Sequence, residues 1–400
     1  MSFRLSHIHE YNRFIAIDLG SYRIRASIYE IENGVLVEKW KVSIRQNRKN
    51  FLDGAITNLQ WVASSIEQAI IQASQYLEEI PNDVILAFSP EICIFDSITT
   101  QYIRADRDST LTMQEIDSMI QKIEHHSLER AKEKSKIQYG VVHDDIRLVS
   151  STLTAIYIDG KRVTNPIGFT GWQVRIQVLN VFVPASEFNI LRSIVANLGK
   201  NTISLVPMPL IFPKVIENTE YAAENNAYID IGYMHTTVVF ESKNEIIAFE
   251  TFPLWTRSLI DSFSLHHPRL SLIEIEHILF QKKIESSEND LRNQVTKEFA
   301  SYIIDSVLGL LEQEKNGFIV KNFFYSGALF HTDSIAQQFS KQLEMSYDYS
   351  FRFLPLGNGD TEKNSDYSIC FGLSLLAQEL LVLKKDPVIR ILRYVLYHYD

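Results

Sequence analysis

Two short segments of this 400-residue chain match each other, and they constrain its fold more than any other feature. Residues 15–20 read Ile-Ala-Ile-Asp-Leu-Gly, and residues 227–232, about 210 positions later, read Ala-Tyr-Ile-Asp-Ile-Gly. Each is followed by a second run of Ile and Val, a polar turn and a third apolar run, which predicts two matching β-hairpins. In the first copy, Asn33-Gly34 fits a two-residue hairpin turn. The repeat indicates two similar domains that face each other.

A strand that ends in Asp-x-Gly has a use in binding phosphate. Glycine lets the backbone approach phosphate oxygens, the N–H groups of the turn can point at them, and the aspartate can hold Mg²⁺ through water. The candidate residues are Asp18, Gly20, Ser21, Arg23 and Arg25 in the first hairpin and Asp230, Gly232 and Thr236 in the second. One hairpin per domain would hold a nucleotide's phosphates from both sides. The alternative is a pair of ordinary hairpins whose Asp and Gly only form turns.

Composition excludes several classes of protein. The net charge of −10 argues against broad nucleic-acid binding, which needs a basic face. Charges interrupt every apolar stretch well before the roughly 20 residues of a membrane span, and we expect no signal peptide at the N-terminus. The two cysteines, Cys93 and Cys370, lack metal-ligand spacing and suit a reducing cytoplasm.

The segment between residues 94 and 180 has its own pattern. Thr112 to Glu115 fits a capping box, which predicts a helix, and we expect its charged end at 128–136 to be solvated. Two strand runs follow, separated by the turn residues Asp159-Gly160 and Asn165-Pro166. The order strand, helix, strand, strand predicts a small α+β subdomain inserted between larger α/β parts.

At this point the chain resembles known families. The paired hairpins look like those of the actin, Hsp70 and sugar-kinase superfamily. The stretch at 157–178 is similar to the hallmark of FtsA, a bacterial cell-division family with a D-G…P-x-G-[MF]-x-G run in a subdomain of its own. The matching residues are Asp159, Gly160, Pro166, Gly168, Phe169 and Gly171. The resemblance extends over about residues 13–380 and is strongest at 157–171.

The resemblance implies an α/β, actin-like two-domain fold with duplicated phosphate-binding hairpins and an inserted α+β subdomain. The implied units are domain I (1–93, 181–206 and 368–385), the insertion (94–180), domain II (207–367, with a smaller subdomain near 254–305) and a C-terminal helix (386–400).

The function implied by the resemblance is that of a cell-division adaptor. It would bind ATP and Mg²⁺, assemble with itself through the insertion, and tether the FtsZ ring to the membrane. Its partners would be FtsZ, further copies of the chain and an anionic membrane surface, with no nucleic acid. We therefore expect a cytoplasmic protein, peripheral on the inner face of the cell membrane at the division site.

The implied nucleotide-binding residues are Asp18, Gly20, Ser21, Arg25, Asp230, Gly232, Thr236, Glu276, Ser326 and Gly327, the last three flanking the nucleoside, with Asp18 and Asp230 organising Mg²⁺ through water. The chain departs from the family at several of these loops. Where FtsA-like proteins have D-x-G-G-G-T-T, Tyr233 and Met234 replace two glycines, and a later Gly-Gly is Trp255-Thr256. Side chains here stand where backbone should approach a ligand, which predicts at most a weak ATPase.

The C-terminus predicts an amphipathic helix. Asp386 can cap it, with Pro387 at its first position. The expected membrane-binding residues are Val388, Arg390, Ile391, Leu392, Arg393, Val395 and Leu396. Such a helix can lie in a membrane interface with its arginines near anionic head groups, as the resemblance to FtsA also implies. The alternative is a last helix packed on the body of the protein.

Two other functions remain open from the sequence. An actin-like adaptor for pilus or secretion assembly would bind a cytoplasmic peptide of a membrane protein and would not need the amphipathic tail. A small-molecule kinase would need an aspartate base aimed at a substrate hydroxyl and an intact glycine-rich adenosine loop, and neither is evident in the sequence.

Overall fold

The computed structural model of the chain describes residues 13–52, 54–139, 145–242, 245–254, 256–280, 286–313, 319–327, 337, 339–342, 350–354 and 367–383. One large sheet contains β1 (Arg13–Leu19), β2 (Arg23–Glu32), β3 (Val35–Arg45), β6 (Asp83–Phe88) and β11 (Asn201–Pro207). A second contains β12 (Asn225–Ile231), β13 (Thr236–Ser242), β14 (Glu245–Phe252), β15 (Asn322–Ser326) and β16 (Ser350–Phe353).

These two sheets have the same plan. The strand orders are β3-β2-β1-β6-β11 and β14-β13-β12-β15-β16, each with an antiparallel hairpin followed by parallel strands. The hairpin registers also correspond, because Asp18 lies opposite Arg25 and Asp230 lies opposite Thr237. The predicted duplication is therefore confirmed at the level of strand pairing.

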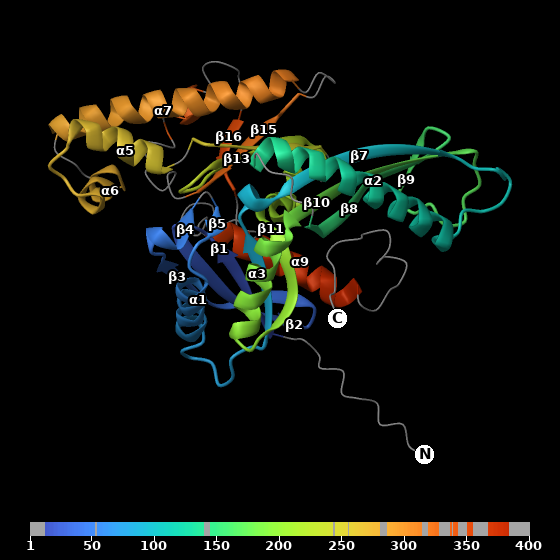
Figure 1. The fold of residues 1–400 in the computed structure, drawn as a ribbon, viewed down its shortest axis with the longest axis horizontal. Helices are drawn as coiled ribbons and strands as arrows, with labels where there is room; N and C mark the ends of the chain where they lie inside the picture. The colour runs from blue at the N-terminus through green and yellow to red at the C-terminus, as the bar shows by residue number, and fades with distance from the viewer. Residues whose placement is uncertain are drawn as a thin grey trace.

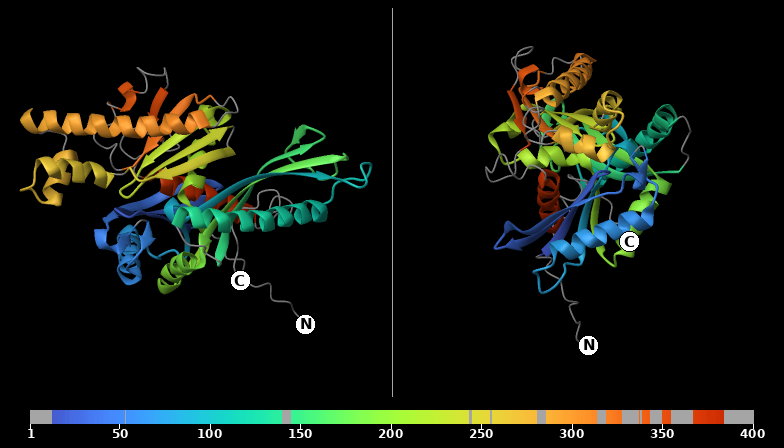
Figure 2. Two further views of the ribbon diagram at one scale, coloured as in Figure 1. Left: turned by 45° about the horizontal axis from the view of Figure 1, so that its top comes forward. Right: turned by 90° about the vertical axis from the view of Figure 1, so that its left-hand side faces the viewer.

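Helices cover both faces of the first sheet. On one face, α1 (Leu59–Ala73) and α3 (Ala185–Asn197) bury apolar side chains against β1 and β2. On the other face lie α4 (Phe212–Ile216) and α9 (Ser368–Leu383), between the two large sheets (Figure 2). Phe14 of the first sheet and Tyr228 and Phe324 of the second belong to this shared core, which joins the two halves of the molecule.

Between β14 and β15, the chain forms α5 (Thr256–His266), α6 (Leu272–Phe280) and α7 (Ser286–Gln313). Phe263 of α5 and Ile303 of α7 pack on the outer face of the second sheet, against Ile229 and Phe240. These helices extend to one side of the molecule, as Figure 1 shows at upper left. They form a helical unit beside the cleft that the two large sheets share.

The insertion is a separate layer. It contains β7 (Ile94–Ile103), α2 (Met113–Tyr139), β8 (Ile146–Ile158), β9 (Lys161–Val163) and β10 (Gln173–Pro184). Its antiparallel sheet has the order β7-β10-β8-β9, and α2 packs against it. The unit projects from the body on the side opposite the α5–α7 helices (Figure 1). The α+β insertion was predicted correctly, with β9 as an additional short strand; a further two-stranded pair, β4 (Phe51–Leu52) and β5 (Ala55–Ile56), lies in the first half of the chain.

Two local features agree with the sequence signals that predicted them: the turn between β2 and β3 and the start of α2. Asn33 and Gly34 have φ angles of 51° and 82°, as a two-residue hairpin turn requires. At the start of α2, the N–H of Glu115 donates to Thr112 Oγ1 at 3.2 Å, so Thr112 caps the helix as predicted. The carboxylate of Glu115 does not close the predicted capping box; it accepts hydrogen bonds from Arg104 instead.

The charged second half of α2 differs from the expectation of a simply solvated end. Asp96 of β7 is fully buried beneath it and accepts a hydrogen bond from Ser127 Oγ at 2.7 Å. The same carboxylate lies 3.2 Å from Arg130 Nη2 and 2.8 Å from Lys134 Nζ. Because a buried charge must be paired, these two cations fasten the helix to the sheet.

Within the described ranges, no helix is long and apolar enough to cross a membrane. The predicted C-terminal helix at 386–400, with all of its expected membrane-binding residues, lies outside the described part of the chain. The domain boundaries read from the sequence likewise remain predictions.

Candidate functional site

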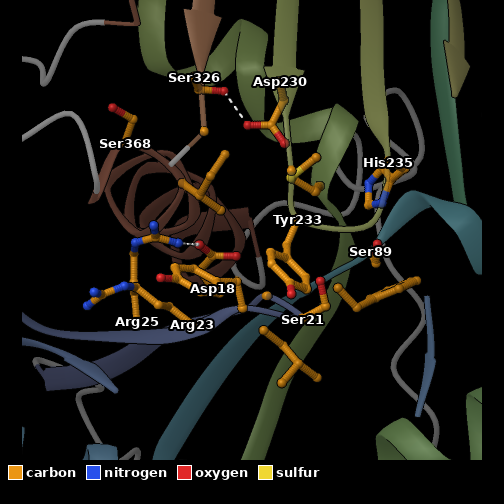
Figure 3. A pocket seen from close by; sticks show the side chains of 18 residues that line it. Asp18, Ser21, Arg23, Arg25, Ser89, Asp230, Tyr233, His235, Ser326 and Ser368 are labelled. Atoms are coloured by element: carbon orange, nitrogen blue, oxygen red, sulfur yellow. Dashed lines mark hydrogen bonds and ion pairs between the residues drawn. The ribbon is translucent and has the colours of Figure 1, made fainter. Parts of the chain in front are cut away.

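The carboxyl ends of β1 and β12 meet in the cleft between the two large sheets, around a cavity of about 90 Å³ (Figure 3). Eight of the ten predicted nucleotide-binding residues line it: Asp18, Gly20, Ser21, Arg25, Asp230, Gly232, Ser326 and Gly327. Tyr22, Arg23, Ser89, Tyr233, His235 and Ser368 also line it. The lining contains both aspartates of the repeat together with apolar side chains.

Three of its glycines are required by the backbone. A β carbon at Gly20 would lie 2.7 Å from the carbonyl oxygen of Arg23, and one at Gly232 would lie 3.0 Å from that of His235. At Gly327, φ is +107° and a β carbon would lie 2.2 Å from the carbonyl oxygen of Ile231. A side chain at Gly20 or Gly327 would force the turn apart, and one at Gly232 would require the His235 carbonyl to shift by a few tenths of an ångström.

The aspartate of the first hairpin, Asp18, forms an ion pair with a residue of the adjacent strand. Arg25 Nη1 lies 3.1 Å from Asp18 Oδ2, and both side chains are nearly buried. The pairing follows from the strand register, because residues directly opposite on an antiparallel pair share a face of the sheet. The site therefore holds a guanidinium beside the first carboxylate, which suits contact with an anion.

The aspartate of the second hairpin is buried as well. Its Oδ1 accepts a hydrogen bond from Ser326 Oγ at 2.6 Å. Burial raises the pKa of Asp230 above its usual range, and the Ser326 hydroxyl, His235 and Arg25 oppose the rise. A carboxylate in this position favours a compensating cation, because its charge is only partly balanced by the protein.

Two side chains of the second loop, those of Tyr233 and His235, cross the cleft. They stand where the family pattern has glycine and threonine. The ring of Tyr233 stacks on that of Tyr22, with centroids 5.1 Å apart and planes 16° from parallel. His235 Nδ1 contacts the carboxylate of Glu91, which also accepts a hydrogen bond from Ser89. Residues of the first domain thus contact residues of the second at the site itself.

Two predicted residues lie outside this cavity. Thr236 is fully buried, and its hydroxyl donates to the carbonyl oxygen of Leu254. Glu276 of α6 lines a second, wider hollow of about 710 Å³ and forms an ion pair with Arg45 of β3. Tyr22 lines both hollows and so stands between them.

Sequence reasoning missed Tyr22, Ser89, Glu91, His235 and Ser368. For Ser89 a signal was available, because it follows the parallel strand β6, and ligands of α/β sheets bind at the carboxyl ends of such strands. Tyr22 lies between the candidate residues Ser21 and Arg23, whereas His235 and Glu91 come into contact only because the two domains meet there. No local pattern announces such contacts.

The residues present fit a phosphate group with Mg²⁺. The hairpin turns and the guanidinium groups of Arg23 and Arg25 suit phosphate oxygens, and Asp18 and Asp230 offer carboxylate oxygens to a hydrated cation. In the described part of the chain, no cluster of three or more His, Cys, Asp or Glu could hold a metal by itself. A Mg²⁺ ion would therefore depend on phosphate oxygens for part of its coordination.

Solved structures with this arrangement are numerous. A chain of a PilM–PilN type IV pilus biogenesis complex has a TM-score of 0.65 at 13% identity, covering 91% of this chain and 98% of that one. The fold is actin-like. MreB5 of Spiroplasma citri bound to ADP has a TM-score of 0.51 at 11% identity, covering 94% and 99%. The ethanolamine utilization protein EutJ from Carboxydothermus hydrogenoformans also has 0.51 at 11% identity, covering 91% and 89%.

These similarities confirm the predicted actin-like fold and are not specific to FtsA. No protein-family model matches the sequence, and no curated protein matches it. With identities this low, function must be argued from the residues of this chain.

Proposed function

We propose that this actin-fold chain is a cell-division adaptor of the FtsA type, which assembles with itself and tethers FtsZ to the inner face of the membrane. The observation that carries the proposal is the tip of the insertion, where the FtsA-like motif residues meet. The motif is more specific than the fold, because actin-like folds serve many functions.

Each part of the motif has a structural role at the tip. Asp159 and Gly160 form a turn with φ angles of 47° and 79°, and the Asp159 carboxylate accepts the N–H of Gln173 at 2.8 Å. Gly168 has a φ of 84°, and a β carbon at Gly171 would lie 2.3 Å from Ile158 Cγ2. These residue types are therefore suited to build this loop, and this supports the proposal that the motif has a structural role here.

Arg104 fastens the same loop from inside. Its side chain is buried and donates to the carbonyl oxygens of Ser109 at 2.9 Å and Gly171 at 3.0 Å. The loop presents Phe169 and Trp172, whose exposed fractions are 49% and 57%. Two exposed aromatics on a rigid projecting tip suit a contact with the next copy in a filament.

Nucleotide binding is part of the proposal. The phosphates of ATP would lie between the hairpins, near Arg23 and Arg25, with Mg²⁺ held through Asp18 and Asp230. When bound, Mg²⁺ would neutralise phosphate charge and so lower the repulsion from the two carboxylates. Glu276, in the neighbouring hollow, would face the nucleoside. We propose weak ATPase activity at most, because Tyr233 lies where the family pattern has glycine.

Membrane attachment would come from residues 386–400, with Leu392 and Val395 on the apolar face and Arg390 and Arg393 beside it. A single helix of this kind binds anionic lipid reversibly, and a filament would gain by avidity. The proposed location is therefore the cytoplasm, on the inner face of the membrane at the division site.

Co-sedimentation tests the proposal. FtsZ is mixed with anionic liposomes and this protein, with and without Mg-ATP, and we expect FtsZ to pellet only when the protein is present. The matched control is the double variant Phe169→Ser with Trp172→Ser, which should still bind FtsZ but lose filaments on a lipid monolayer. FtsZ that stays in the supernatant under all conditions would refute the division role.

A second candidate is an adaptor for pilus assembly, favoured by the similarity to the PilM–PilN complex. That function would require binding to a short cytoplasmic peptide of a membrane protein, without FtsZ. Calorimetry with an FtsZ C-terminal peptide and with N-terminal cytoplasmic peptides of inner-membrane assembly proteins distinguishes the two. Binding to the second class alone would favour the pilus role.

A further inference from the structure

A stack of two tyrosines joins the halves of the molecule across the cleft. Tyr22 belongs to the turn of the first hairpin and Tyr233 to the turn of the second, so the ring pair bridges the two domains. Tyr233 is buried, with 5% of its surface exposed. The guanidinium groups of Arg23 and Arg45 lie 5.5 Å and 5.3 Å from the centre of the Tyr22 ring. These contacts fix Tyr22 on the side of the first domain.

Two further contacts between the domains flank the stack. Glu91 of the first domain contacts His235 of the second, and both side chains are nearly buried. Arg45 of β3 pairs with Glu276 of α6, whose side chain is only 5% exposed. The closed arrangement of the domains is therefore held by side chains of the protein itself, in the region where the proposed ligand would lie.

The size of the cavity limits which ligands fit between the hairpins in this closed arrangement. Pockets for molecules of nucleotide size measure roughly 300–1,000 Å³. The space between the hairpins is about 90 Å³, enough for a phosphate-sized group. The wider hollow at α6 measures about 710 Å³, and Tyr22 stands between the two. A nucleotide that used both hollows would have to displace the Tyr22–Tyr233 stack.

We propose that Tyr22 and Tyr233 form a latch that closes the cleft without nucleotide, so that ATP binds only in competition with the stack. The inference rests on the nucleotide site of the proposed function. The backbone at position 233 does not demand glycine, because Asn33 and Asp159 are the only non-glycine residues with positive φ among those described. The tyrosine there can thus point into the cleft at no cost in backbone strain.

Nucleotide affinity provides the first test. An aromatic pair contributes about 0.5–1.5 kcal/mol beyond its buried area, so removing it from competition should tighten binding about two- to tenfold. We expect this gain for Tyr233→Gly, measured with a fluorescent ATP analogue. Tyr233→Phe keeps the stack and should bind like wild type. Tyr302→Gly, which removes an exposed tyrosine from α7, is the control for an unrelated surface change.

Domain closure provides the second test and needs no nucleotide. Spin labels at Gln68→Cys on α1 and Lys297→Cys on α7, both exposed positions, report the distance between the two domains. The natural cysteines are buried and should not react. In wild type we expect one narrow distance distribution with or without Mg-ATP. In Tyr233→Gly we expect a broad distribution without nucleotide that narrows when Mg-ATP is added.

The outcomes separate the latch from the proposed function. Equal ATP affinity of wild type and Tyr233→Gly, or a wild-type cleft that opens without nucleotide, would overturn the latch. If no variant binds ATP at all, the nucleotide part of the proposed function fails, while a broadened distribution in Tyr233→Gly would still support the latch. Should Tyr233→Gly fail to fold, Tyr22→Ser removes the stack from the other side and must give the same results.

Discussion

Replacing Arg104 with methionine should loosen the tip of the insertion while leaving the rest of the molecule intact. Arg104 donates through Nη1 to the carbonyl oxygens of Ser109 and Gly171, and through Nε and Nη2 to both carboxylate oxygens of Glu115. Methionine has a similar length and apolar character along the stem, so the substitution removes the donors with little change in packing.

The expected loss follows from these bonds. A hydrogen bond to a charged group contributes about 1.5–3 kcal/mol, and Arg104 makes two to backbone carbonyls. The carboxylate of Glu115 is 31% exposed, so solvent weakens that pair, and we count about 1 kcal/mol for it. We take about 1.5 kcal/mol for each bond to a carbonyl oxygen, the lower end of the range. Because water can enter part of the vacated site and replace some of the lost bonds, the local free energy of unfolding of the tip should fall by about 3 kcal/mol.

Hydrogen exchange measures this loss where it occurs. A change of about 3 kcal/mol in local opening speeds exchange on the order of 100-fold, and we expect it at the amides of Leu111, Gly168 and Gly171, which close the loop. Arg107→Met is the matched control, because that side chain is 75% exposed and should change exchange little. If the three amides exchange at wild-type rates in Arg104→Met, the reasoning about the tip is wrong.

Three further changes test other parts of the molecule. Burial raises the folded-state pKa of Asp230 above its unfolded value, so its ionised form opposes folding: Asp230→Asn should melt higher than wild type at pH 7, and the difference should vanish below about pH 4. Gly327→Ala combines positive φ with a backbone clash and should destabilise by about 2–4 kcal/mol in urea, more than Gly34→Ala, where φ is also positive but nothing lies within 4 Å. Leu392→Glu with Val395→Glu should release the protein from anionic liposomes at an unchanged melting temperature; a destabilised variant from a parent that does not bind lipid would support a packed helix instead.

The parts of the fold that the sequence predicted are those with local causes. The hairpin turn at Asn33-Gly34 follows from residues that accept positive φ, and the duplicated strands follow from apolar runs that end in the same Asp-x-Gly pattern. The insertion was also largely predictable, because a capping residue marked its helix and turn residues marked the break between its later strands, although the short strand β9 was missed. Partners of single charged groups, such as those of Asp96 and Arg104, were not, since they depend on which strand lies beneath a helix.

The residues of the candidate site likewise include some that the sequence could predict and some that it could not. Asp18 and Asp230 come together because each ends the central strand of its sheet. Thr236 lies outside the cavity because of the register: Thr237 lies opposite Asp230, as Arg25 lies opposite Asp18, so the Thr236 side chain points to the other face of the sheet. This could have been predicted from strand alternation, because both pairs are separated by the same number of residues. The contacts of Tyr233 and His235 could not be predicted from the sequence, because they are made with residues of the first domain and depend on how the two domains pack together.

The pattern of kept and lost glycines has a physical explanation. Gly20, Gly232 and Gly327 are kept, and at each a β carbon would collide with the backbone of the protein itself. At position 233 a tyrosine replaces the expected glycine without positive φ, and at 256 the threonine donates its N–H and hydroxyl to the carbonyl of Gly232. The lost glycines therefore stand where the backbone of the protein has no need of them. The side chains there make contacts of two kinds: Tyr233 stacks on Tyr22 across the cleft, and Thr256 hydrogen-bonds to Gly232 within the second half of the molecule.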